Sequence, residues 1–128
     1  QILGEMKAWA YGGESGLQLD TMRVHPKAPP VIGDLVWAAT MAWSLEATPC
    51  RRARLLAIRD DNHQHALLVR YFRQRGFLTI REVGSVPSDL PLRMVWGGAG
   101  SLMVATCSEV FERSYKRMNK ELVHANLS

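Results

Sequence analysis

The residues with the clearest capacity for chemistry lie where a predicted strand runs into a predicted helix. The segment 17–24 alternates apolar and polar side chains, which predicts a strand, and it ends in Val24-His25-Pro26. A short loop then leads to Gly33 at a helix start, where Asp34 suits the first turn. The first N–H groups of a helix have no partner inside it, and with the helix dipole they favour an anion. The sequence therefore predicts an anion site at this junction.

Other side chains are candidates for proton transfer or nucleophilic attack. Asp20, on the predicted strand 17–24, is the best-placed general base and Glu82 a weaker one. The alternative role for Asp20 is an exposed hydrogen-bond acceptor. Cys50 and Cys107 form no CxxC pair, which favours buried structural thiols in a reducing intracellular compartment over a nucleophile. No Cys/His spacing of a zinc site is present, so no metal is expected.

The first half of the chain must position the junction. The segments 4–11 and 17–24 flank the glycine-rich turn 12–16 and predict an antiparallel hairpin. The helix from Gly33 is apolar on most sides, which predicts that it is buried. One stripe comprises Leu35, Ala38, Ala39, Ala42 and Leu45, and a second stripe beside it comprises Val36, Thr40 and Trp43.

The second half continues the alternation of strands and helices. We expect a strand at 53–58, a helix at 63–75 capped by residues 60–62, strands at 77–83 and 92–96, and an amphipathic helix at 108–122. Gly76 is expected to end its helix in the left-handed conformation. In the helix 63–75, Leu67, Leu68, Tyr71 and Phe72 should face the core, and Arg70, Arg73 and Arg75 should face water. The order predicts an α/β or α+β domain around a mixed sheet.

These elements resemble the GNAT acyltransferase superfamily, which moves acetyl groups from acetyl-CoA to amines. The resemblance covers residues 4–96 and rests on Val24-His25-Pro26, on Gly33, and on the run 70–77 that ends in Gly76-Phe77. It implies a GNAT-like mixed sheet flanked by helices, with acetyl-CoA as the cofactor. It further implies that the pantetheine arm contacts Met22, Arg23 and Val24, and that the pyrophosphate faces Val31, Ile32, Gly33 and Asp34.

The chain departs from the family pattern at three places. Pro29 and Pro30 stand in the loop where N–H donors hold the pyrophosphate. Proline lacks that donor, and each lost charged hydrogen bond costs about 1.5–3 kcal/mol, which predicts weaker cofactor binding. Phe72 replaces the Tyr that commonly protonates the departing thiolate, and Tyr71 is the neighbouring substitute. His65 replaces a cofactor-contacting Asn, with a capping or surface role as the alternative.

Three functions remain open. The first is an N-acetyltransferase in which a small amine, a protein N-terminus or a lysine attacks acetyl-CoA directly. The second is a catalytically inactive GNAT-like subunit or assembly factor in a larger complex. The third is a basic RNA- or ribosome-associated domain, suggested by the net charge of +4. Its phosphate contacts would be Arg51, Arg52, Arg54, Arg70, Arg73 and Arg75.

Length and composition bear on the organisation of the chain. The 128 residues are 47% hydrophobic, which is typical of a globular domain, and no apolar run has the ~18 residues that a membrane helix needs.

A GNAT domain opens with a strand, two helices and another strand before its central hairpin. We therefore expect residues 1–105 to be the C-terminal portion of such a domain, lacking its N-terminal strand and helices, and 106–128 to be a helix and tail. A protein partner is expected to cover the uncovered sheet face. Similar GNAT-like proteins of plants, algae and cyanobacteria imply a plastid stroma.

Overall fold

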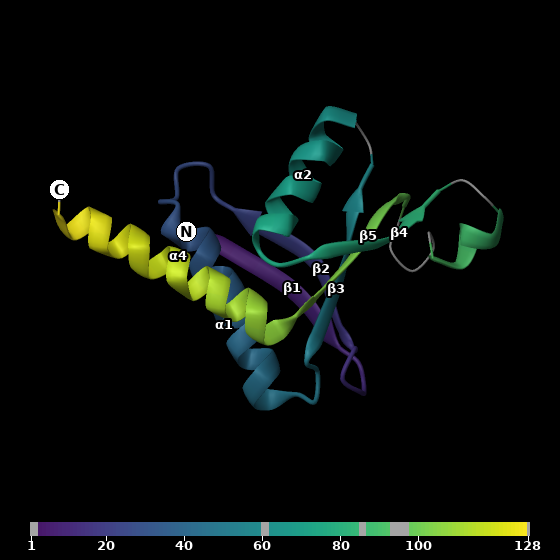
Figure 1. Ribbon diagram of the computed structural model, residues 1–128, viewed down its shortest axis with the longest axis horizontal. Coiled ribbons are helices and arrows are strands. Elements are labelled where there is room, and N and C mark those ends of the chain that lie inside the picture. The colour runs from purple at the N-terminus through teal and green to yellow at the C-terminus, as the bar shows by residue number, and fades with distance from the viewer. Residues whose placement is uncertain (1–2, 60–61, 85–86, 93–97, 128) are drawn as a thin grey trace.

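The computed structural model describes residues 3–59, 62–84, 87–92 and 98–127. These residues form a five-stranded mixed sheet with three long helices, so the predicted α+β class is confirmed. The strands lie in the order β1-β2-β3-β5-β4 (Figure 1). The strands are β1 (Gly4–Ala10), β2 (Leu17–Val24), β3 (Arg52–Ile58), β4 (Leu78–Val83) and β5 (Gly100–Thr106). The helices are α1 (Val31–Ala47), α2 (Asn62–Gln74) and α4 (Cys107–Leu127), with a short 3-10 turn at Pro87–Asp89.

The predicted hairpin is confirmed. β1 pairs antiparallel with β2 from Gly4 opposite Val24 to Ala10 opposite Leu17. The turn closes where the Tyr11 N–H donates to the Gly16 carbonyl at 2.8 Å. A Cβ on Gly16 would lie 2.3 Å from the Tyr11 carbonyl oxygen, so only glycine permits this approach.

The three helices lie on one face of the sheet. Met103 and Ala105 of β5 point into the core that Trp37 and Met41 of α1 and Val110 of α4 complete. Ser101 shares their face because side chains alternate along a strand, and it lines a groove together with residues of α2. Figure 1 shows α4 running alongside α1. The alternate positions on the opposite face are only half-buried at Leu56, Ile58, Leu102 and Val104, and Leu78 is 64% exposed.

Aromatic side chains join the helices to the sheet. Trp37 is 1% exposed, and its ring lies 5.7 Å from Phe77 and 6.1 Å from Phe72. Phe77 follows Gly76, whose φ of 105° is the predicted left-handed helix end. Gly76 therefore turns the chain from α2 into the core and sets where β4 begins.

The predicted core faces of the helices were partly wrong. In α1 the buried line is Asp34, Trp37, Ala38, Met41 and Ser44, whereas Leu35 is 48% exposed and Ala39 is exposed. A helix with apolar residues on most sides does not reveal which side its neighbours cover. In α2, Leu67 and Leu68 are exposed rather than buried, and Arg75 is buried rather than exposed. α4 buries Val110 and Ser114, while Tyr115 and Leu122 are exposed.

The last strand also differs from the prediction. Leu92 is helical, and the rest of the predicted strand 92–96 lies outside the described residues. Residues 60 and 61 of the predicted helix cap at 60–62 also lie outside them. The strand that completes the sheet is β5, inserted between β3 and β4 and antiparallel to both. It runs directly into α4 at Cys107, whose N–H donates to the Arg51 carbonyl at 2.8 Å.

Candidate functional site

β2 and β3 separate shortly after they meet, and this divergence organises the candidate site. They are parallel but pair only at Leu17 with Ala53 and at Gln18 with Arg54. On the other edge of β2, Thr21 pairs with Lys7 and Leu19 with Ala8, which leaves Asp20 as the extra residue of a bulge. Bulges bend a strand and re-aim its side chains. The bulge therefore lies where β2 turns away from β3.

A small cavity of about 60 Å³ occupies the divergence. Three predicted site residues, Asp20, Met22 and Phe72, line it together. Trp37 of α1 and Leu55 of β3 contribute to its apolar wall. Asp20 itself is exposed, so its carboxylate stands at the edge of the cavity in contact with water.

Tyr71 reaches the same region with its hydroxyl. The hydroxyl oxygen accepts the Trp37 Nε1–H at 2.9 Å, and the O–H points to the Met22 Sδ at 3.7 Å. A Cβ on Gly33 would lie 4.0 Å from both the Tyr71 hydroxyl and the Met22 methyl. Tyr71, Met22 and Gly33 therefore meet at this point.

The start of α1 offers backbone donors. Pro30 is the N-cap and has no side chain that can cap the helix, while the Ile32 N–H donates to the Pro29 carbonyl at 3.0 Å. Gly33 is buried, and Val31 and Ile32 are half-buried. Arg23 and Val24 line a separate hollow of about 250 Å³ beside the start of β1.

Asp34 does not leave an uncompensated negative charge at this junction. Arg75 Nη2 lies 3.0 Å from Asp34 Oδ1, and the two side chains are 9% and 2% exposed. The Arg75 guanidinium also lies 3.9 Å from the centre of the Tyr71 ring. Burial lowers the pKa of Arg75, and the opposing effects of Tyr71 and Asp34 keep it charged. The prediction that Arg75 contacts solvent or phosphate was therefore wrong.

Glu121 of α4 is part of this buried cluster, and the sequence analysis missed it. Burial raises the pKa of the Glu121 carboxyl, and the charge of Asp34 and a hydrogen bond to it raise it further. The sequence gives little sign of this contact, because residues 34 and 121 are far apart in the chain. Glu121 also lies on a helix with many other charged residues. Ionisable side chains from α1, from the residue that follows α2 and from α4 thus lie close together.

His65 lies about two helical turns before Phe72 on α2 and does not line the cavity. Its Nε2 is 2.9 Å from Ser101 Oγ, and Ser101 donates to both oxygens of Glu82 at 2.8 Å. Glu82 also pairs with Arg59. His65 is therefore not brought to the predicted cofactor site, and Glu82 is held in a hydrogen-bond network rather than placed as a base at the cavity.

Both thiols are buried and free, in agreement with the structural role predicted for them. Cys107 Sγ lies 3.8 Å from Ser44 Oγ, and burial raises the pKa of the Cys107 thiol, which disfavours the reactive thiolate. Within the described ranges no cluster of three or more His, Cys, Asp or Glu side chains is arranged to hold a metal ion. Among the same residues, no helix is both long and apolar enough to cross a bilayer.

Because comparison with known proteins gives no match, the function is inferred from the fold and the site. The sequence matches no protein-family model and has no significant match among curated proteins.

Proposed function

We propose that this chain is a GNAT-like N-acetyltransferase that transfers an acetyl group from acetyl-CoA to an amine. The observation that carries the proposal is the divergence of parallel strands β2 and β3 around a bulge and a small, mainly apolar cavity that opens at Asp20. A volume of about 60 Å³ has room for a few water molecules, a scale that suits a two-carbon acyl group. A long acyl chain would not fit inside it.

The residues around the cavity fit acetyl-CoA in part. The free backbone N–H groups at the start of α1, at Val31 and Gly33, suit its pyrophosphate, and Arg75 neutralises the neighbouring Asp34. Pro29 and Pro30 supply no donor there, which is consistent with weak binding. When bound, acetyl-CoA supplies a thioester carbonyl that an amine attacks directly.

Tyr71 is the proton donor that we propose for the departing thiolate. Its hydroxyl lies beside Met22 and Gly33, whereas the Phe72 ring has no proton to give and forms apolar wall. Asp20 stands on the bulge at the exposed edge of the cavity, where it would take a proton from the incoming amine. The acceptor would approach from that edge.

A second candidate is a non-catalytic GNAT-like subunit, and one observation favours it. The sheet face opposite the helices presents a row of half-buried or exposed apolar side chains, Leu56, Ile58, Leu78, Leu102 and Val104. Large apolar surfaces of this kind are typical of interfaces, which supports a protein partner on this face. In this reading, as in the first, the resemblance to plant and algal proteins suggests a plastid stroma.

Calorimetric titration with acetyl-CoA, followed by turnover measured on a panel of amines, tests the proposal. We expect binding and turnover, with kcat of Tyr71→Phe reduced by about 10²–10⁴-fold because general acid catalysis contributes that much. The variant keeps the ring under Arg75, so acetyl-CoA binding should not change. Tyr115→Phe, on the exposed side of α4, is the matched control.

The same experiment distinguishes between the two candidate functions. No heat at millimolar acetyl-CoA would refute the acetyltransferase. Binding without turnover on any amine would instead support the non-catalytic subunit.

A further inference from the structure

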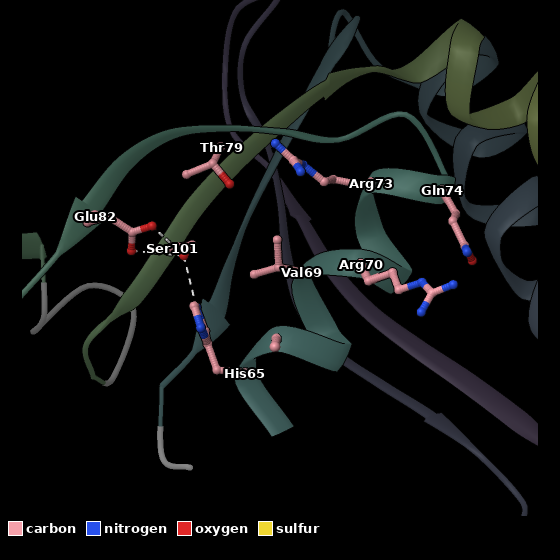
Figure 2. A pocket seen from close by; sticks show the side chains of 9 residues that line it. His65, Val69, Arg70, Arg73, Gln74, Thr79, Glu82 and Ser101 are labelled. Carbon is pink, nitrogen blue, oxygen red and sulfur yellow. Dashed lines mark hydrogen bonds between the residues drawn. The ribbon is translucent and has the colours of Figure 1, made fainter. Parts of the chain in front are cut away.

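A second, larger hollow lies between α2 and the strands β4 and β5. Its volume is about 790 Å³, within the range of sites for small molecules. Figure 2 shows His65 and Glu82 converging on Ser101, with Arg73 extended toward Thr79 of β4. This hollow is separate from the cavity at the divergence of β2 and β3, since the two share no lining residue. We call it the α2–β4 groove.

A hydrogen-bond network sets the polar end of the groove. Ser101 has a single hydroxyl proton, which it donates to Glu82, so its oxygen accepts the N–H of His65 Nε2 at 2.9 Å. Arg59 pairs with the same carboxylate of Glu82. The one carboxylate that lines the groove is therefore already balanced by a cation and held by a hydroxyl.

Two guanidinium groups on α2 provide uncompensated positive charge. Arg70 and Arg73 are exposed, and within the described part of the chain neither forms an ion pair. Arg75 is not available here because it is buried against Asp34. The guanidinium fork matches the geometry of phosphate oxygens, and the Thr79 hydroxyl adds a further donor.

The remaining surface of the groove is apolar. Ala66 and Val69 lie on the same side of α2 as the two arginines, one turn apart along the helix. We propose that the α2–β4 groove binds a small phosphorylated molecule, with its phosphate at Arg73 and Thr79, under the added positive charge of Arg70, and its apolar or planar body against Ala66 and Val69. The proposal is independent of acetyl transfer.

NMR titration with adenosine 5′-monophosphate as the probe tests this assignment. We expect shifts of the backbone amides of Val69, Thr79 and Ser101, smaller shifts with inorganic phosphate, and none with adenosine. Arg70→Gln and Arg73→Gln should each weaken binding by about fivefold, since exposed charge pairs contribute up to about 1 kcal/mol. Lys116→Gln on α4 removes an exposed cation away from the groove and should have no effect. All three substituted residues are exposed, so the variants should fold.

Several results would overturn the proposal. Unchanged groove amides at millimolar nucleotide would refute it, as would equal shifts with adenosine, because the phosphate would then not be recognised. Shifts confined to the start of α1 would place the phosphate at the other site. Binding of an RNA oligomer in the absence of any binding of the mononucleotide would likewise reject a small-molecule site.

Discussion

Replacing Arg75 by methionine should destabilise this protein far more than the loss of any exposed arginine. Arg75 is 7% exposed, and it is the cation facing Asp34, which is 1% exposed. Glu121 lies close enough to Asp34 to share a hydrogen bond with it. Arg75→Met would keep most of the buried aliphatic volume but leave the Asp34 carboxylate buried without its ion-pair partner.

Breaking a buried ion pair by removing one partner costs about 3–5 kcal/mol. Unfolding entropy is about 2.1 cal/mol/K per residue, so for 128 residues 1 °C of Tm corresponds to about 0.27 kcal/mol. We therefore expect Tm to fall by about 11–19 °C at neutral pH. Part of the loss should be recovered in acid, where the Glu121 carboxyl, whose pKa is raised by burial, is neutral.

Thermal and urea unfolding followed by circular dichroism would measure the change. The double variant Asp34→Leu with Arg75→Met removes both charges, and we expect it to regain most of the lost stability because apolar replacement of a buried pair is often neutral. Arg113→Gln, an exposed arginine on α4, is the control and should change stability by less than about 1 kcal/mol. A single Arg75→Met variant as stable as this control would refute the reasoning.

Two further predictions concern α4 and the end of α2. The raised pKa of Glu121 gives stability that is present below the ordinary carboxyl pKa of 4.5 and is lost as the pH rises through the folded-state value. Glu121→Gln should therefore unfold at a higher temperature than wild type at neutral pH, with no difference at acidic pH; a pH-independent difference would contradict this. Gly76→Ala should cost about 1–2 kcal/mol in chemical denaturation, because φ is 105° and the added Cβ would lie 2.8 Å from Glu109 Oε2. Gly12→Ala, with open space around its Cβ position, should be nearly neutral, and equal losses in the two variants would disprove the strain argument.

Local patterns predicted the elements well wherever one side of an element faces water. β2 was predicted at 17–24 and forms at Leu17–Val24, and the left-handed glycine at position 76 was placed correctly. The hydrophobic pattern did not predict which side of α1 is buried, because a helix with apolar residues on most sides gives no sign of which side is covered. It also missed β5, whose run of small and apolar residues has no clear period.

The candidate site shows the same division. Asp20, Met22 and Phe72 were expected near one another, and they line one cavity. His65 was expected there too, but its side chain is hydrogen-bonded to Ser101 of β5 instead. Its neighbour in space is 36 residues away in sequence, so no local pattern could reveal the pairing.

The sequence by itself determined the α+β class, the hairpin and the helix-end glycine at position 76, because each depends on residues within a few positions of one another. The tertiary structure alone decided which charges are neutralised. Arg75 looked like one more solvent-facing arginine of a basic helix, and only the tertiary packing buries it against Asp34, 41 residues away. Burial and Coulomb energy depend on separation in space, and that separation is set by packing between elements.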